Sequence, residues 1–259
     1  MVALEKRKIL QTDITHGSYE TILAEILDLG RSREPCYICV ADVHMVVEAF
    51  WDKSFNHVVN SSVITTPDGK PLSVFMNLLY DTRQERVAGP DLMIDILRKA
   101  SEESLLIYFY GSTWEVLNAI SDRLKREYPS LKIAGMISPP FRPLTEEEDE
   151  EIIKTINQSG ANLVLVALGC PKQEKWMYEH QGKIKATMVG VGAAFPFLAG
   201  QLKRAPKWIR DFCLEWAFRL MMEPRRLFKR YFVTNTVFLL MITRQLLYQK
   251  LFQSGFSKV

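Results

Sequence analysis

The stretch that decides the fold reads LVLVALGCPKQEKW and occupies residues 163–176. Its first part, Leu163–Leu168, is a short apolar run of the kind found in strands buried on both faces, and Gly169 ends it. Pro171 then stands where the first turn of a helix is expected, because its fixed φ suits that position. The stretch therefore predicts a strand that passes directly into a helix, whose free N–H groups suit an anion such as a diphosphate.

The same strand-to-helix unit recurs along the chain. Further short apolar runs predict strands at Lys8–Ile14, Cys36–Asp42, Val63–Thr66, Leu105–Tyr110, Leu131–Met136 and Thr187–Val191. Helical periodicity predicts helices over 114–127 and 146–158, and Thr145 begins a capping box for the second. This alternation predicts an α/β, Rossmann-like fold with a mostly parallel sheet and helices on both faces.

The charges of the 259-residue chain are unevenly distributed. From Lys203 to the end there are twelve basic and three acidic residues, a net charge of +9, so the preceding residues carry −6 of the overall +3. Past Gly200, Pro206–Met222 and the chain from Pro224 onward predict helices with no further strand. We therefore divide the chain into a catalytic body, 1–200, and a basic amphipathic segment, 201–259. Such asymmetry suits an anionic partner: nucleic acid, phosphate or a membrane surface.

Nothing in the sequence predicts a membrane span or a secretion signal. The longest uncharged late stretch, Tyr231–Thr243, has 13 residues, whereas a spanning helix needs about 20. Met1–Lys8 is charged and has no apolar run of the kind found in signal peptides. We expect a cytoplasmic protein that lies on the inner face of the cell membrane.

The cysteines and histidines predict neither a disulfide framework nor a metal site. Cys36 and Cys39 fall three residues apart in a predicted strand, which places them on opposite faces. Cys170 and Cys213 are isolated, and the four histidines lack metal-ligand spacing. We expect buried thiols in a reducing compartment, no metal and no cofactor.

Ligands of parallel α/β sheets bind at the carboxyl ends of the strands. The residues at and shortly after the end of each predicted strand are therefore the candidates for substrate binding: Asp42, Thr66, Gly111, Ser112, Ser138, Gly169, Pro171, Gln173, Gly190, Gly192 and Phe195. Asp68 lies in the turn Pro67-Asp68-Gly69 after such a strand. It is either an ordinary turn residue or a carboxylate placed to take a proton from a hydroxyl nucleophile.

Several motifs, taken together and in order, resemble the WecG/TagA/CpsF glycosyltransferase family from about Val40 to Tyr231. They are Pro67-Asp68-Gly69, Arg86–Leu92, Ser138–Phe141, Gly169–Trp176, Gly190–Phe195, Arg204–Trp208 and Leu214–Arg226.

The resemblance implies an inverting, metal-independent transfer of a hexosyl or N-acetylhexosaminyl group from a UDP-sugar to a polyprenyl-diphosphate-linked sugar, in cell-surface or extracellular polysaccharide synthesis. It implies that Asp68 is the general base and that Arg86 and Gln173 lie near the substrates. It also implies that the basic C-terminal helices bind an anionic membrane and bring arginines to the leaving diphosphate. Arg219 and Arg226 are the candidates for that role.

Two positions depart from the family pattern. Pro196 stands where many members have Asp, and Asp42 stands where many have Asn. These departures leave the donor and acceptor sugars open. The missing Asp at Pro196 and the incomplete Gly-rich loop Gly190–Phe195 also support a second hypothesis: a non-catalytic nucleotide-binding module that recruits partners to membranes. A nucleic-acid partner is not expected, because no recognised nucleic-acid-binding motif accompanies the basic segment.

Overall fold

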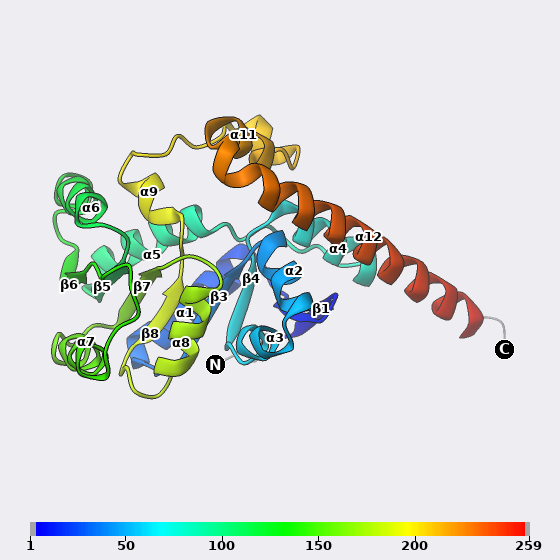
Figure 1. Cartoon of the computed structure of the whole chain (residues 1–259). Coiled ribbons are helices and arrows are strands. Elements are labelled where there is room, and N and C mark those ends of the chain that lie inside the picture. Colours follow the sequence, from blue (N-terminus) through cyan, green and yellow to red (C-terminus); the bar gives the residue numbers. More distant parts are fainter. Residues whose placement is uncertain (1–3, 257–259) are drawn as a thin grey trace.

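A six-stranded parallel sheet forms the centre of the computed structural model, which describes residues 4–256 (Figure 1). The strands lie in the order β4-β3-β8-β7-β5-β6, and all neighbours run parallel. Their bounds are β3 Tyr37–Ala41, β4 Ile64–Pro67, β5 Leu106–Gly111, β6 Lys132–Ile137, β7 Leu163–Ala167 and β8 Thr187–Gly190. The predicted parallel sheet is confirmed, and each predicted strand end lies within one residue of the observed one.

The first predicted strand is wrong. In place of a single strand over Lys8–Ile14, the chain forms an antiparallel hairpin of β1 (Lys6–Ile9) and β2 (Thr12–Thr15). The reason is Leu10, which adopts the left-handed backbone conformation with φ 53° and so turns the chain. The polar and apolar residues of this range follow one another as in a single strand, so the sequence pattern did not reveal the turn.

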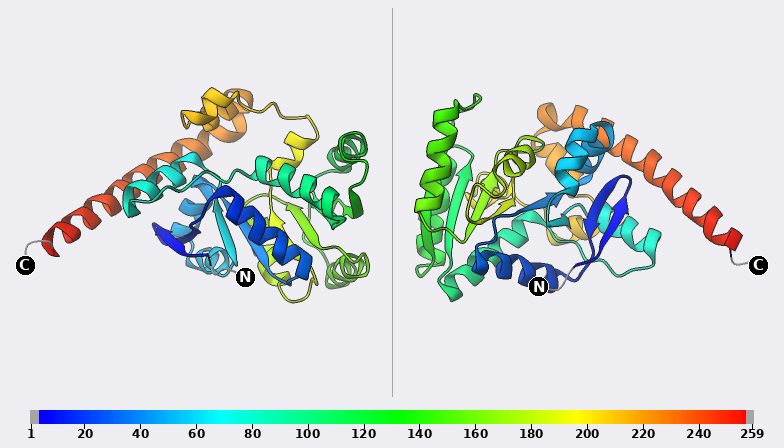
Figure 2. Two further views of the ribbon diagram at one scale, coloured as in Figure 1. Left: turned by 180° about the vertical axis from the view of Figure 1, so that it is seen from behind. Right: turned by 90° about the horizontal axis from the view of Figure 1, so that it is seen from below.

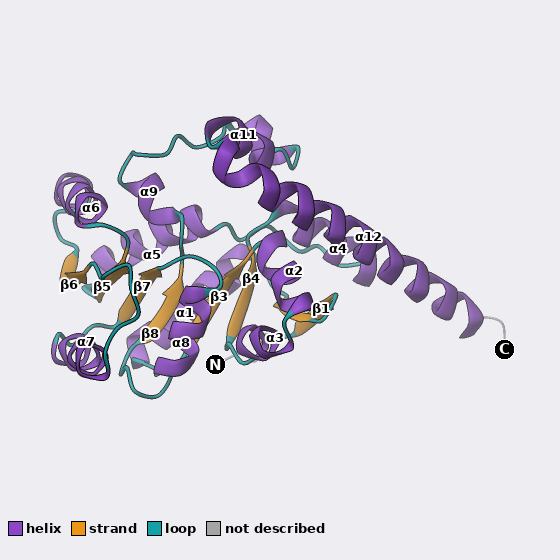
Figure 3. Cartoon of the chain, in the orientation of Figure 1, coloured by secondary structure: helices purple, strands orange, loops and turns teal. Residues whose placement is uncertain are grey.

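Helices cover both faces of the sheet, as predicted (Figure 3). One face carries α1 Tyr19–Ser32, α5 Gly89–Glu103, α6 Trp114–Glu127 and the short α9 Ala194–Leu198. The other face carries α2 Val43–Trp51, α3 Lys53–Asn60, α4 Lys70–Tyr80, α7 Glu146–Gln158, α8 Lys172–His180 and α12 Pro224–Phe256. The predicted helices 114–127 and 146–158 match α6 and α7, and the capping box that Thr145 forms with Glu148 is present.

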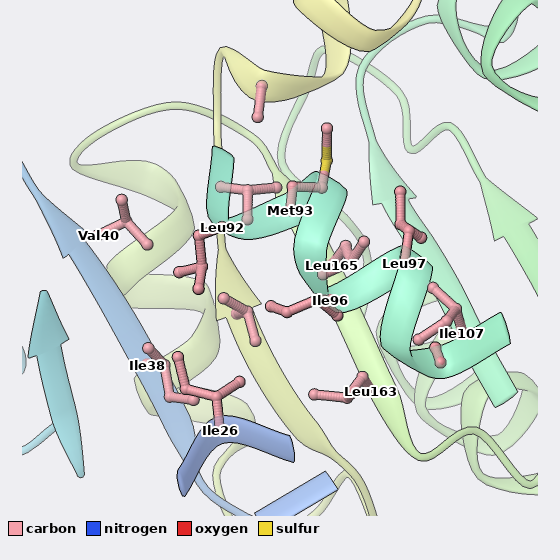
Figure 4. Packing of buried hydrophobic residues seen from close by; sticks show 14 of the residues in the cluster. Ile26, Ile38, Val40, Leu92, Met93, Ile96, Leu97, Ile107, Leu163 and Leu165 are labelled. Carbon is pink, nitrogen blue, oxygen red and sulfur yellow. The ribbon is translucent and has the colours of Figure 1, made fainter. Parts of the chain in front are cut away.

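The strands are apolar throughout because each buries both of its faces. In β3, Ile38 packs against α1 and α5, whereas Tyr37 and Cys39 contact the opposite helix layer. Figure 4 shows part of the first of these clusters, to which Leu163 of the sheet and Ile96 of α5 both belong. This two-sided core holds the strands rigidly, so the loops at their carboxyl ends have fixed positions.

Cys36 and Cys39 are placed as predicted, whereas Cys170 and Cys213 are partly exposed instead of buried. Cys36 belongs to one core cluster and Cys39 to the other, so the two thiols lie on opposite sides of the sheet. Both are buried, and all four cysteines are free thiols.

The C-terminal segment is helical but is divided differently from the prediction. A single helix over Pro206–Met222 is wrong: α10 (Lys207–Asp211) and α11 (Glu215–Met222) are separate. Cys213 lies between them with φ 62°, a left-handed conformation that ends the first helix. The break lets α11 turn back over the carboxyl ends of the strands (Figure 1).

The long helix α12 is part of the core over its middle turns. Phe238 and Ile242 are 1% and 0% exposed, and the ring of Phe238 lies 5.6 Å from that of Phe75 on α4. The far end of α12 extends beyond the body (Figure 2). Within residues 4–256, no helix is both long enough and apolar enough to span a membrane. Of the basic residues counted above, Lys258 and the side chain of Lys250 lie outside what the structure describes.

Candidate active site

A cavity of about 700 Å³ lies at the carboxyl ends of the strands. Its floor and walls come from the segments that follow β3, β4, β5, β7 and β8, as expected for a parallel α/β sheet. Its roof comes from α11, α12 and the segment before α11, so both parts of the chain enclose it. The sheet topology thus brings together residues from the two ends of the sequence.

Most of the predicted site residues meet in this cavity. It is lined by Asp42, Asp68, Arg86, Ser112, Gly169, Gln173, Gly190, Gly192, Arg219 and Arg226.

The other predicted residues lie outside the lining and have structural contacts. Thr66 donates a hydrogen bond to the carbonyl of Val87 (3.3 Å), and Ser138 donates one to the carbonyl of Ser112 (2.7 Å). Gly111 has φ +116°, and Pro171 is the N-cap residue of α8. Phe195 is fully buried, with its ring 5.5 Å from that of Phe109 in the core.

Asp68 lies directly after β4, on a turn that holds its carboxylate toward the cavity. Its Oδ1 accepts from the backbone N–H of Gly89 (3.2 Å) and lies 3.4 Å from an Nη2 of Arg86. Arg86 also donates through Nε to the backbone carbonyl of Asp68. Within residues 4–256, no hydrogen bond engages Oδ2, which leaves that oxygen able to accept a proton.

The surroundings of Asp68 make its carboxyl group more basic than an ordinary aspartate. The pKa of Asp68 is raised to about 6. The main cause is withdrawal of the carboxyl group from water; Arg86 lowers the pKa, and the nearby carboxylates of Asp42 and Glu215 raise it. A carboxyl group with this pKa is mostly ionised at neutral pH yet is a stronger base than an ordinary aspartate.

Glu215, on α11, is a site residue that the sequence did not single out. Its Oε2 lies 2.6 Å from Nη2 of Arg86, so Arg86 contacts a carboxylate from the body and one from the C-terminal segment. Its side chain is 15% exposed. One signal was available: Glu215 is among only three acidic residues in an otherwise basic segment.

A second ion pair joins the body and the C-terminal segment. Here the carboxylate belongs to the body and the guanidinium belongs to the segment. Asp42 accepts from the backbone N–H of Met45 (2.9 Å) and caps α2, while its other oxygen lies 3.2 Å from Nη2 of Arg230 on α12. The negative charge at position 42 therefore has a partner within the chain. It holds the first turns of α12 over the cavity.

Arginines dominate the roof of the cavity. Arg210, Arg219, Arg226 and Arg230 all line it, and the guanidinium of Arg219 lies 5.8 Å from the ring centre of Phe197. The Nε atoms of Arg210, Arg219 and Arg230 are buried and form no hydrogen bond within the described part of the chain. Buried donors of this kind need an acceptor, and a phosphate group supplies several.

Comparison with known proteins agrees with this geometry. Residues 7–251 match the family model described as "Glycosyl transferase WecG/TagA/CpsF family". A protein of Bacillus subtilis (strain 168), named N-acetylglucosaminyldiphosphoundecaprenol N-acetyl-beta-D-mannosaminyltransferase, is 30% identical over 73% of this chain and 72% of its own length. A protein of the same name from Staphylococcus aureus (strain MW2) is 27% identical over 76% of each chain.

Proposed function

The chain belongs to the WecG/TagA/CpsF glycosyltransferase family, and on that premise we propose the reaction it catalyses. The donor is a UDP-sugar and the transferred group is N-acetylmannosamine. The acceptor is N-acetylglucosaminyl-diphosphoundecaprenol, and this sugar and acceptor are those in the names of the relatives. The transfer inverts the anomeric carbon and needs no metal ion, and the product enters a cell-surface polysaccharide.

The observation that carries this proposal is the placement of Asp68 in one cavity with four roof arginines. The acceptor hydroxyl oxygen attacks the anomeric carbon, and its proton passes to the free Oδ2 of Asp68. The bond from the anomeric carbon to the diphosphate breaks, and UDP leaves with the electron pair. Inversion of an α-linked donor in this way gives the β-linkage in the relatives' names.

The departing diphosphate needs positive charge as its own charge grows. Arg219 is the best-placed donor, because its Nε is buried without a partner and it forms no ion pair within the described structure. The other two roof arginines with an unpartnered Nε are paired elsewhere: Arg210 lies 3.6 Å from Asp91, and Arg230 lies 3.2 Å from Asp42. Arg226 stands nearer the rim: its side chain is 63% exposed and it pairs with Glu223 at 3.0 Å. We assign Arg219 and Arg226 to the leaving group and Arg86 to the orientation of Asp68.

The segment 201–259 is proposed as the part that contacts the membrane. Its helices expose large apolar side chains, including Trp208 (62%), Phe228 (62%), Phe232 (67%) and Leu240 (63%). Arg225 and Lys229 are interleaved with them, and each basic residue near an anionic bilayer contributes about 1 kcal/mol. This surface would place the cavity beside a lipid-linked acceptor on the inner face of the cell membrane.

The test measures turnover with defined substrates. Purified protein is incubated with UDP-N-acetylmannosamine and a short-chain polyprenyl-diphosphate N-acetylglucosamine, and both UDP release and the disaccharide-lipid are quantified. Asp68→Asn should lose about 10²- to 10⁴-fold in rate. Asp81→Asn is the matched control, because Asp81 is exposed after α4 and its left-handed backbone (φ 51°) suits Asn.

The outcome also separates the two hypotheses. Product formation that depends on Asp68 supports the transferase, whereas UDP binding without turnover of any UDP-sugar supports the non-catalytic module. Full activity of Asp68→Asn would remove Asp68 as the base.

A further inference from the structure

A buried carboxyl group without a basic partner lies beside the cavity. Glu174, in the first turn of α8, is 0% exposed, and one of its oxygens, Oε2, forms no hydrogen bond within residues 4–256. Among the described residues no cation forms an ion pair with Glu174. Its pKa is raised to about 7, mainly by burial; hydrogen bonding to Gln173 and Cys170 lowers the pKa, and the carboxylate of Asp42 raises it. Burying a carboxyl group in this way is costly for folding.

The neighbour of Glu174 lines the cavity. Nε2 of Gln173 donates a hydrogen bond to Oε1 of Glu174 at 2.6 Å. A side-chain amide carries its donors on nitrogen and its acceptor on oxygen. This contact therefore directs Nε2 of Gln173 toward Glu174 and leaves Oε1 on the other side of the amide. A protonated Glu174 still keeps a carbonyl oxygen that accepts, so the orientation holds in both protonation states.

The other end of the amide has no partner. Oε1 of Gln173 is buried and forms no hydrogen bond in the described part of the chain, although the residue is only 4% exposed. Glycines at and after the end of β8 make room for the amide: a Cβ at Gly190 would lie 3.0 Å from Nε2, and one at Gly192 would lie 3.4 Å from Oε1. A buried acceptor needs a hydrogen-bond donor, and in the wall of a cavity a bound ligand can supply one.

We propose that Glu174 is a positioning residue that fixes the amide of Gln173 with its oxygen toward the cavity, so that Gln173 accepts a hydrogen bond from an N–H group of the donor substrate. The proposal rests on the proposed function for the identity of that substrate. A UDP-N-acetylhexosamine has two such groups: the imide N–H of the uracil ring and the N–H of the acetamido group. In both cases an amide-type N–H group of the ligand donates a hydrogen bond to the buried side-chain carbonyl oxygen of Gln173.

The positioning step is tested without any ligand. In protein with ¹⁵N-labelled glutamine, the side-chain NH₂ resonance of Gln173, assigned with Gln173→Met, should shift with a midpoint near pH 7 as Glu174 ionises. Glu174→Gln should abolish that titration, whereas Glu179→Gln, an exposed change on the same helix, should leave it unchanged. If the chemical shift of the Gln173 side-chain NH₂ group changes neither with pH nor in Glu174→Gln, the positioning role is refuted.

The acceptor role is tested by binding. Calorimetry compares UDP with 3-N-methyl-UDP, which lacks the imide N–H, and UDP-N-acetylmannosamine with its 2-deoxy analogue, which lacks the acetamido group. In the wild type, one of the two deletions should weaken binding about 3- to 10-fold through the lost hydrogen bond. That penalty should fall to near 1-fold in Gln173→Met and to an intermediate value in Glu174→Met.

The pair of deletions identifies the source of the N–H. A penalty confined to 3-N-methyl-UDP assigns the base, and one confined to the 2-deoxy analogue assigns the sugar. Penalties that persist unchanged in Gln173→Met would refute the acceptor role. If the wild type binds none of the nucleotides, the proposed function fails with the acceptor role, while the resonance experiment still decides whether Glu174 orients Gln173.

Discussion

The contact of Arg86 with two carboxylates predicts how the pH profile responds to a change in the C-terminal segment. In Glu215→Gln, the negative charge next to Arg86 disappears, while the size of the side chain is kept. Glu215 Oε2 and Asp68 Oδ1 lie 2.6 Å and 3.4 Å from the same Nη2 atom. The two carboxylate oxygens are therefore no more than about 6 Å apart, since both contact that nitrogen.

The size of the effect follows from this separation. At about 6 Å, two unit charges interact by roughly 0.7 kcal/mol with the dielectric constant of water and roughly 2.8 kcal/mol with an effective value of 20. Glu215 raises the pKa of Asp68, so its loss lowers that pKa. Because one pH unit corresponds to about 1.4 kcal/mol, the acid limb should move down by about 0.5 to 2 pH units.

The assay is kcat/KM for UDP release as a function of pH, which reports ionisations of the free enzyme. The base must be deprotonated to act, so wild-type kcat/KM should fall as the pH drops through about 6. Glu215→Gln should keep its activity to lower pH. Asp211→Asn is the matched control: it also removes one acidic charge from the segment, but Asp211 is exposed and pairs with Lys207 at 2.7 Å.

Three outcomes would refute the reasoning. An acid limb that stays in place in Glu215→Gln would mean that Glu215 has no electrostatic effect on the base. A limb that moves upward would mean that the dominant effect is lost structure. An equal shift in Asp211→Asn would mean that the overall charge of the segment, and not the contact with Arg86, sets the pH dependence.

Three further predictions concern the roof, the floor and the core of the site. Arg219→Gln should lower kcat in single-turnover assays by roughly 10²-fold, as for the loss of one donor to a developing negative charge, whereas the exposed Arg225→Gln should have little effect on kcat. Gly190→Ala should cost about 1 kcal/mol in the free energy of unfolding, because its Cβ would lie 2.7 Å from Cε of Met177, the flexible end of a side chain that can shift; unchanged urea denaturation would contradict the packing argument. Phe238→Ala should cost about 3–5 kcal/mol, while Leu240→Ala, 63% exposed, should leave stability unchanged and weaken sedimentation with anionic vesicles; equal stability loss in both would contradict the burial pattern.

The elements that the sequence predicted well are those whose signals are local. Strands buried on both faces read as unbroken apolar runs, so β7 and its entry into α8 could be predicted from a few adjacent residues. The capping box at Thr145 is a pattern of four residues and was found for the same reason. The hairpin of β1 and β2 was missed because its turn depends on Leu10, a residue type that rarely adopts φ 53°.

In the candidate site, too, the sequence placed some residues correctly and others not. Asp68 and Gln173 follow strands, and the rule that ligands bind at the carboxyl ends of strands selects both of them from the amino-acid order alone. Phe195 satisfies the same rule, yet its side chain turns into the core beside Phe109. A rule about backbone position predicts where a loop lies but not which of its side chains faces the cavity.

By itself, the sequence determined the α/β alternation, the strand ends that carry Asp68 and Gln173, and the division into an acidic body and a basic C-terminal segment. Only the tertiary structure decided how that segment meets the body. The pairs Arg86–Glu215 and Asp42–Arg230 join residues more than a hundred positions apart, and Asp42 and Arg230 are separated by 188. Contacts at that separation leave no periodicity or local motif, because they depend on where the sheet brings the chain, and they set the charge around Asp68.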